Sequence, residues 1–173
     1  MNNQLLPSRL LCLPEQMEDA LRILNAPNQL SVYLIGSLRN PEVPKVADEL
    51  RRAGFEVFDD WYAAGPEADD YWQKYEIARG HTYAQALQGY AARHVFDFDC
   101  KHLTRCDIGV LMLPAGKSGH LELGYMAGMG KRTAILLDKV PERYDVMYQF
   151  ASAGVHSDLK TLIESLGQGG SNG

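Results

Sequence analysis

The fold of this chain is decided by residues 107–137, which read DIGVLMLPAGKSGHLELGYMAGMGKRTAILL. Residues 108–113 are an apolar run bounded by turn residues, as is typical of a buried parallel strand. A glycine-rich turn follows over residues 114–119, a helical pattern begins at His120, and residues 132–137 predict the next strand. Strand, turn, helix and strand in this order indicate an open α/β sheet, in which ligands bind at the carboxyl ends of the strands.

A glutamate near the start of the predicted helix is the first candidate for chemistry. The spacing of Leu121, Tyr125 and Met129 predicts one apolar stripe, and Gly130 is expected to end the helix. This places Glu122 on the first turn, above the carboxyl ends of the strands. A carboxylate there interacts favourably with the helix dipole by about 0.3–1 kcal/mol, which would explain the residue without any chemistry.

Three neighbouring features favour a catalytic role for Glu122. Gly119 and Gly124 leave room for close approach, and a glycine-rich turn between a strand and a helix is a place where small ligands bind. A second acid, Asp99, precedes the strand on what the pattern predicts to be a short helix. Two carboxylates at one site can divide the roles of nucleophile and general acid between them.

These residues also carry a resemblance to a known family. The segment DCKHLTRCD at 99–107, the apolar strand, and GHLELGY at 119–125 resemble the nucleoside 2-deoxyribosyltransferase superfamily. That superfamily also contains the 2'-deoxynucleoside 5'-monophosphate N-glycosidases and the pyrimidine-nucleotide hydrolases. GSLR at 36–39 is similar to the Gly-Ser-Ile-Arg loop of the nucleotide hydrolases. The resemblance covers residues 30–153.

The resemblance implies a fold and an activity. We expect a flavodoxin-like, five-stranded parallel sheet with strand order 2-1-3-4-5 and no cofactor. We expect an enzyme that cleaves the N-glycosidic bond of a (deoxy)nucleoside or its 5'-monophosphate, by hydrolysis or by base transfer. Glu122 would be the nucleophile and Asp99 the acid/base group. Two alternatives stay open: an NAD glycohydrolase resembling the TIR-like enzymes, and a nucleotide-binding module without turnover.

Further substrate contacts are expected after the first two strands, in the turn before the helix, and on a segment that the family supplies from a neighbouring subunit. These residues are Gly36, Ser37, Arg39, Trp61, Tyr62, Gly116, Lys117, Ser118, Gly119, Asp145 and Met147. A hydroxyl and a guanidinium fork suit a phosphate or a sugar hydroxyl, although a helix cap and a surface arginine would look the same. Aromatic faces suit a nucleobase.

The signals for a 5'-phosphate conflict. Ser37 and Arg39 favour it. Gly116 stands where the transferases carry an aspartate and the phosphate-cleaving branch a serine, and Lys117 and Ser118 replace that serine only in part. Asp145 disfavours a phosphate by like-charge repulsion. On balance these residues lean slightly toward a nucleotide or a modified nucleotide.

The rest of the chain is organised around this centre. We predict strands over 30–35 and 55–58, and helices over 43–50, 69–79, 143–150 and 159–166. A capping box at Thr82 predicts the start of a further helix, which has Ala84, Leu87, Ala91 and Val95 along one side. Residues 59–98 are an aromatic helical insertion, most of whose rings are expected to pack on the sheet or on a neighbouring subunit. We expect residues 1–29 to be an N-terminal appendage with a short helix over 15–24. We expect residues 30–166 to form the α/β domain and 167–173 a flexible tail.

Composition excludes several classes of function. The chain has 173 residues, 46% of them hydrophobic, and a formal charge of −5, so we expect one domain and no nucleic-acid surface. No run is long enough to cross a membrane. Cys12, Cys100 and Cys106 have no disulfide or zinc spacing, which favours a cytoplasmic protein without a metal. The expected partners are a nucleoside or nucleotide and further copies of the chain in a homo-oligomer.

Overall fold

A five-stranded, all-parallel sheet with the order β2-β1-β3-β4-β5 forms the centre of the computed structural model, which describes residues 29–167. Its strands are β1 (Ser31–Ile35), β2 (Glu56–Phe58), β3 (Ile108–Met112), β4 (Arg132–Leu136) and β5 (Val155–His156). The predicted flavodoxin-like sheet and its strand order are confirmed. The predicted N-terminal appendage with its helix over 15–24, and the tail beyond residue 167, lie outside the described residues.

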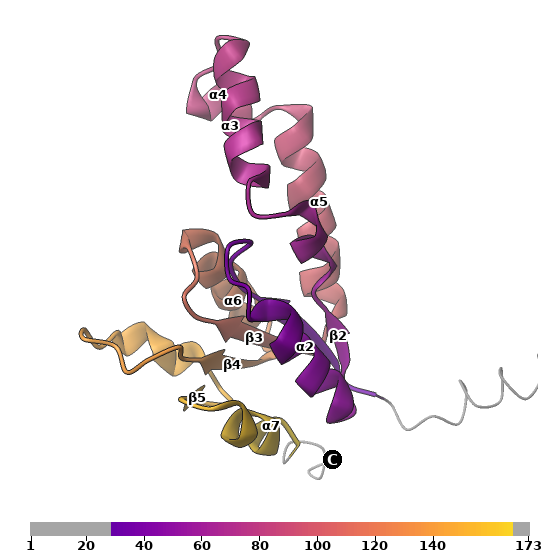
Figure 1. Ribbon diagram of the computed structural model, residues 1–173, viewed down its shortest axis with the longest axis vertical. Coiled ribbons are helices and arrows are strands. Elements are labelled where there is room, and N and C mark those ends of the chain that lie inside the picture. Colours follow the sequence, from indigo (N-terminus) through magenta and orange to yellow (C-terminus); the bar gives the residue numbers. More distant parts are fainter. Residues whose placement is uncertain (1–28, 168–173) are drawn as a thin grey trace, which may run out of the picture.

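Helices cover both faces of the sheet (Figure 1). On one face, α2 (Val43–Arg52) and α7 (Leu159–Gly167) pack on side chains such as Val32 and Leu34. On the other face, α5 (Tyr90–Arg105) and α6 (Lys117–Gly128) pack on the alternate residues Tyr33 and Ile35. The central strands β1 and β3 are therefore apolar at every position or nearly so, because both of their faces are buried.

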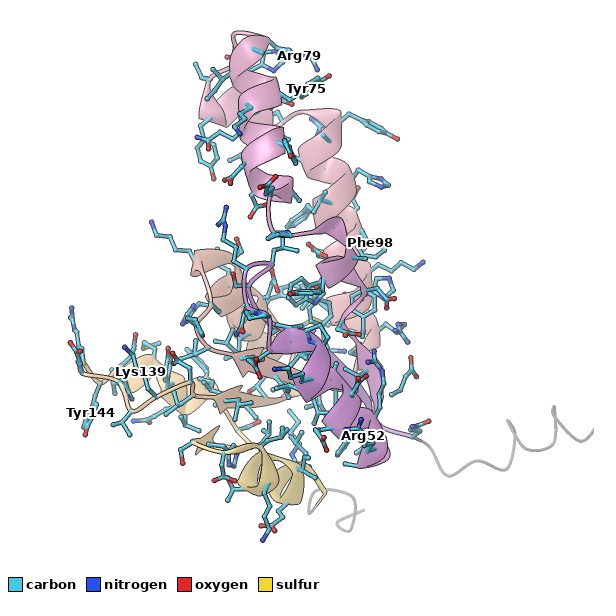
Figure 2. The ribbon with its side chains drawn as sticks, in the orientation of Figure 1. Arg52, Tyr75, Arg79, Phe98, Lys139 and Tyr144 are labelled. Carbon is cyan, nitrogen blue, oxygen red and sulfur yellow. The ribbon has the colours of Figure 1, made fainter. Side chains whose placement is uncertain are left out.

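A helical hairpin stands off the carboxyl end of the sheet (Figure 1). It comprises the 3-10 helix η1 (Asp60–Ala64), α3 (Ala68–Ala78), α4 (Tyr83–Leu87) and the first half of α5. At its far end the Arg79 guanidinium lies 5.2 Å from the centre of the Tyr75 ring (Figure 2). The predicted capping box is present, since Thr82 and Gln85 each accept the other's backbone N–H.

The prediction of one helix from Thr82 through Val95 is wrong, because the chain turns at Gly89. The Gly89 N–H donates to Ala86 O at 2.9 Å and closes the end of α4. A Cβ at this position would lie only 2.9 Å from the same oxygen, so the turn requires glycine. The second helix, α5, then continues without a break to Arg105. Asp99 consequently lies on a long helix instead of the short one that the pattern predicted.

Helix α6 begins at Lys117, three residues earlier than predicted, which places Glu122 on the second turn instead of the first. Its buried residues are Gly119, Leu123 and Met126. The predicted stripe of Leu121, Tyr125 and Met129 is exposed. Gly119 decides this orientation: a Cβ there would lie 3.1 Å from side-chain carbons of both Ile35 and Leu111, so the helix rests on the sheet through its smallest residue.

The segment before β5 is also shorter than predicted. In place of an α-helix over 143–150, a 3-10 helix, η2, spans Val146–Phe150. Asp145 has extended backbone angles, and its carboxylate accepts the Met147 N–H at 2.9 Å, so the turn starts there and not earlier.

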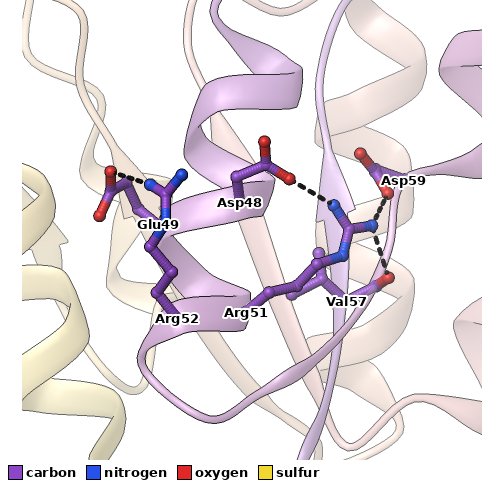
Figure 3. A network of polar contacts seen from close by, with 6 residues as sticks. All are labelled: Asp48, Glu49, Arg51, Arg52, Val57 and Asp59. Atoms are coloured by element: carbon purple, nitrogen blue, oxygen red, sulfur yellow. Dashed lines mark hydrogen bonds and ion pairs between the residues drawn. The ribbon is translucent and has the colours of Figure 1, made fainter.

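A polar network fixes the turn that follows β2. Arg51, on the last turn of α2, donates to the Asp48 carboxylate and to Val57 O, each at 3.2 Å (Figure 3). It also donates to Asp59, whose side chain is 15% exposed. Asp59 precedes η1, so this network ties the end of α2 to the segment that carries Trp61.

Among residues 29–167, no helix is long and apolar enough to cross a membrane.

Candidate functional site

Two carboxyl groups and a tyrosine hydroxyl come together from three elements at one face of the sheet. Tyr33 lies on β1 and is 1% exposed, and its hydroxyl donates to Asp99 Oδ1 at 3.3 Å. Asp99 projects from α5 and Glu122 from α6, and both side chains are half-buried. Burial first, and then the charges of Glu122 and Asp99, raise the pKa of Tyr33, so its hydroxyl keeps its proton.

The electrostatics of this cluster set Glu122 apart. Burial, and secondarily the charge of Asp99, raises the pKa of Glu122 from 4.5 to about 7. Burial also raises the pKa of Asp99, but the hydrogen bond from Tyr33 stabilises the ionised form and opposes the shift. Below pH 7 the pair therefore holds about one proton, and the hydrogen bond from Tyr33 to Asp99 favours its placement on Glu122.

An aromatic stack joins α5, next to Asp99, to the end of β2. The rings of His102 and Phe58 are parallel at 5° with 3.8 Å between centroids, and Phe98 packs against both. Phe58 in turn contacts Tyr33 at 5.1 Å. These contacts hold the part of α5 that carries Asp99 against β2 and β1.

Trp61 and Gly36 lie together at the carboxyl edge of the sheet. The indole Nε1 of Trp61 donates to Leu34 O at 2.8 Å, and its ring would lie 3.3 Å from a Cβ on Gly36. Glycine is therefore needed for the indole to approach β1 this closely. Tyr62 meets Trp61 edge to face at 5.9 Å. Both aromatic residues that were predicted to contact the base are half-buried at this edge.

The loop after β1 carries Ser37 and Arg39, and protein groups contact both. Ser37 Oγ accepts the backbone N–H of Arg39 at 3.2 Å. Arg39 Nη2 donates to both carboxylate oxygens of Asp70, each at 2.9 Å. Among the described residues, no hydrogen bond or ion pair joins Arg39 to the carboxyl pair.

The turn before α6 is linked to η2. Gly116 caps α6, with Lys117, Ser118 and Gly119 following on its first turn. His120 Nδ1 lies 2.9 Å from Gly116 O, and its Nε2 lies 3.0 Å from the Tyr148 hydroxyl. A carbonyl can only accept, so Nδ1 donates and Nε2 accepts from Tyr148. This link holds η2, with the exposed Asp145 and Met147, beside the start of α6.

Tyr33 is the site residue that the sequence analysis missed. It lies in the apolar run of the first strand, where a tyrosine looks like one more core residue. The signal that could have found it is its place two residues before Ile35, on the strand face that α5 and α6 cover. A buried tyrosine hydroxyl needs a partner, and a carboxylate on a neighbouring helix provides one.

No predicted site residue lines the cavity of about 330 Å³ at the ends of β3 and β4, between Asn40, Pro114 and Asp138. Among residues 29–167, no three His, Cys, Asp or Glu side chains are placed to hold one metal ion.

Comparisons with known proteins show the fold. No family model and no curated protein matches the sequence. The structure is similar to a 2-deoxyribosyltransferase from Bacillus psychrosaccharolyticus, with a TM-score of 0.51 and 18% identity over 77% of this chain and 90% of that one. It is also similar to the CMP N-glycosidase BcmB from Clostridium botulinum, with a TM-score of 0.47 and 16% identity over 79% and 98%. The first likeness shows that the chain shares the fold of a 2-deoxyribosyltransferase.

Proposed function

We propose that this protein cleaves the N-glycosidic bond of a (deoxy)nucleoside or of its 5'-monophosphate, with Glu122 as nucleophile and Asp99 as acid/base group. The observation that carries the proposal is the pair of half-buried carboxyl groups from α5 and α6, which interact strongly enough for the charge of Asp99 to raise the pKa of Glu122. Perturbed, coupled carboxyl groups mark sites of acid–base chemistry. The fold that the chain shares with a 2-deoxyribosyltransferase supports the same reaction class.

The chemistry follows from the charges. As the base departs, positive charge develops at the anomeric carbon, and this charge favours the ionised form of Glu122. The Glu122 carboxylate attacks that carbon and forms a glycosyl ester, while the bond to the base breaks and Asp99 donates a proton to the leaving base. Water or a second base then attacks the anomeric carbon and releases Glu122, and Asp99 takes back a proton. Water gives a hydrolase and a second base a transferase.

Tyr33 has a positioning role in this scheme. Its hydroxyl donates to Asp99 at 3.3 Å, so it orients that carboxyl group and stabilises it when it is ionised. In the free protein this bond biases the shared proton toward Glu122. The positive charge that develops at the anomeric carbon favours the ionised form of Glu122. The shared proton therefore moves from Glu122 to Asp99 as the reaction begins.

A homo-oligomer and a cytoplasmic location belong to the proposal. The stripe of Leu121, Tyr125 and Met129 is exposed on α6, and Met147 is 58% exposed on η2. Apolar surface of this kind on neighbouring elements supports contact with a second copy, whose η2 would complete the site. The free thiols of Cys100 and Cys106 are compatible with a reducing compartment.

The test is release of free base. The protein is incubated with a panel of nucleosides, their 5'-monophosphates and NAD, and the products are separated by chromatography. We expect Glu122→Gln to abolish release while its unfolding transition stays cooperative. Glu164→Gln, on the exposed face of α7, is the matched control and should leave release unchanged. Full activity of Glu122→Gln, or no base from any nucleoside or monophosphate, would refute the proposal. Nicotinamide from NAD alone would indicate an NAD glycohydrolase instead.

A further inference from the structure

The guanidinium of Arg39 is held by a carboxylate from the helical hairpin. Arg39 lies in the loop after β1, and Asp70 lies on the first turn of α3. One nitrogen, Nη2, donates to both Asp70 oxygens at 2.9 Å, and the two side chains are 58% and 49% exposed. The Ser37 hydroxyl beside them already accepts the Arg39 N–H. The two groups at this edge that suit a phosphate therefore both make contacts within the protein.

A carboxylate and a phosphate compete for the same guanidinium. Both present oxygens that a guanidinium fork can bind in pairs, and both are anions. A phosphate that approaches Arg39 must displace Asp70, and the displaced carboxylate then repels it at short range. An uncharged ligand that ends in a hydroxyl does not have to displace Asp70 and is not repelled by its carboxylate.

We propose that Asp70 is a specificity-determining residue that lowers activity on 5'-monophosphates relative to the corresponding nucleosides. The inference rests on the proposed function and narrows its substrate class to nucleosides. It explains how a loop that contains Ser37 and Arg39 can bind a substrate without a 5'-phosphate. Exposed ion pairs are weak. The discrimination that Asp70 supplies is accordingly modest, about two- to fivefold in the ratio of kcat/KM values.

The experiment compares a deoxynucleoside with the 5'-monophosphate of the same base. Asp70→Asn keeps the shape of the side chain and removes its charge. We expect the ratio of kcat/KM for the monophosphate over kcat/KM for the nucleoside to rise about two- to fivefold. Adding Arg39→Gln to Asp70→Asn should remove this rise, because the guanidinium that the phosphate would gain is then absent.

A neighbouring residue provides the matched control. Asp69 is exposed one position before Asp70, so Asp69→Asn removes the same charge from the same turn of α3 without touching the contact to Arg39. An unchanged or lower ratio in Asp70→Asn overturns the inference. An equal rise in Asp69→Asn also overturns it, because the effect would then be a general one of charge.

A binding measurement separates this inference from the proposed function. In protein that carries Glu122→Gln, titration calorimetry with the 5'-monophosphate measures affinity without turnover. Asp70→Asn should tighten this binding by about two- to fivefold, and unchanged binding would contradict the inference. Base release from no substrate, together with tighter binding in Asp70→Asn, would refute the proposed reaction and leave the role of Asp70 in place.

Discussion

The pKa of Glu122 makes a quantitative prediction about pH. A nucleophilic glutamate must be ionised, and its pKa here is about 7 in place of 4.5. Base release also needs a protonated Asp99, so the pair must still hold its one shared proton. With a pKa of about 7 the fraction of protein that holds it falls from roughly 91% at pH 6 to roughly 9% at pH 8, and kcat/KM for base release should fall about tenfold between these pH values. With an ordinary pKa of about 4.5 the pair would already have lost this proton at pH 6, and the profile would have no midpoint in this range.

Asp99→Asn tests the cause of the shift. Burial contributes more to the raised pKa of Glu122 than the charge of Asp99 does. Removing that charge should move the midpoint of the pH profile below pH 7, but should not restore the ordinary value, because the burial remains. The overall rate falls as well, since the leaving base loses its acid, and the remaining rate should rise with pH as Glu122 ionises. The position of the midpoint is therefore the quantity to measure, and not the height of the plateau.

The assay is initial-rate chromatography of free base from pH 5.5 to 8.5, with a substrate whose base does not titrate in that range. Circular dichroism at each pH shows that the protein stays folded, and Glu164→Gln should reproduce the wild-type profile. A flat profile would refute the raised pKa of Glu122. A rate that rises as the pH rises through 7 would show that the fully ionised pair is the active form and would refute Asp99 as the proton donor.

Three further predictions concern stability in urea. Because the folded-state pKa of Glu122 is raised, its favourable contribution is present below about pH 4.5 and is lost as the pH rises through 7. Glu122→Gln should therefore be more stable than wild type at pH 8, by about 3 kcal/mol, and equal to it near pH 4. Asp107 accepts the backbone N–H and the hydroxyl of Ser31, at 2.9 and 2.7 Å, and its pKa is lowered, so its contribution holds above the ordinary pKa and is lost in acid. Asp107→Ala should cost about 1 kcal/mol at pH 7 and progressively less as the pH falls below the ordinary pKa of the carboxyl group, and a cost that does not change with pH would contradict this reasoning. Gly119→Val should destabilise by about 1–3 kcal/mol because it forces α6 off the sheet, whereas Gly124→Ala, which meets open space, should stabilise slightly.

The sequence allowed the sheet to be predicted because its central strands are buried on both faces. Such strands must be apolar almost throughout, and residues 30–35 and 108–113 show this directly. The order of the strands came from the resemblance to a family, since apolar runs do not say which strands are neighbours. Glu122 and Asp99 were singled out by their positions beside the glycine-rich turn and before the strand, and their predicted roles came from the resemblance.

What the sequence could not show depends on contacts between distant parts of the chain. The start of α6 is set by how closely Gly119 can rest on the sheet, which local helix signals do not report. The turn at Gly89 depends on one backbone oxygen, that of Ala86. The pairing of Arg39 with Asp70 joins residues 31 positions apart, and nothing in their local sequence distinguishes Asp70 from its neighbour Asp69.

The continuity of α5 limits how this protein can be rebuilt. Its 16 residues form a rod of about 24 Å, and Asp99 lies on the same rod as the turns that stand clear of the sheet (Figure 1). In a chimera whose hairpin is replaced up to residue 98, Asp99 would be the first residue kept from α5, and the ends of helices fray. The hairpin and the acid therefore have to be transplanted together, with a junction placed after Arg105.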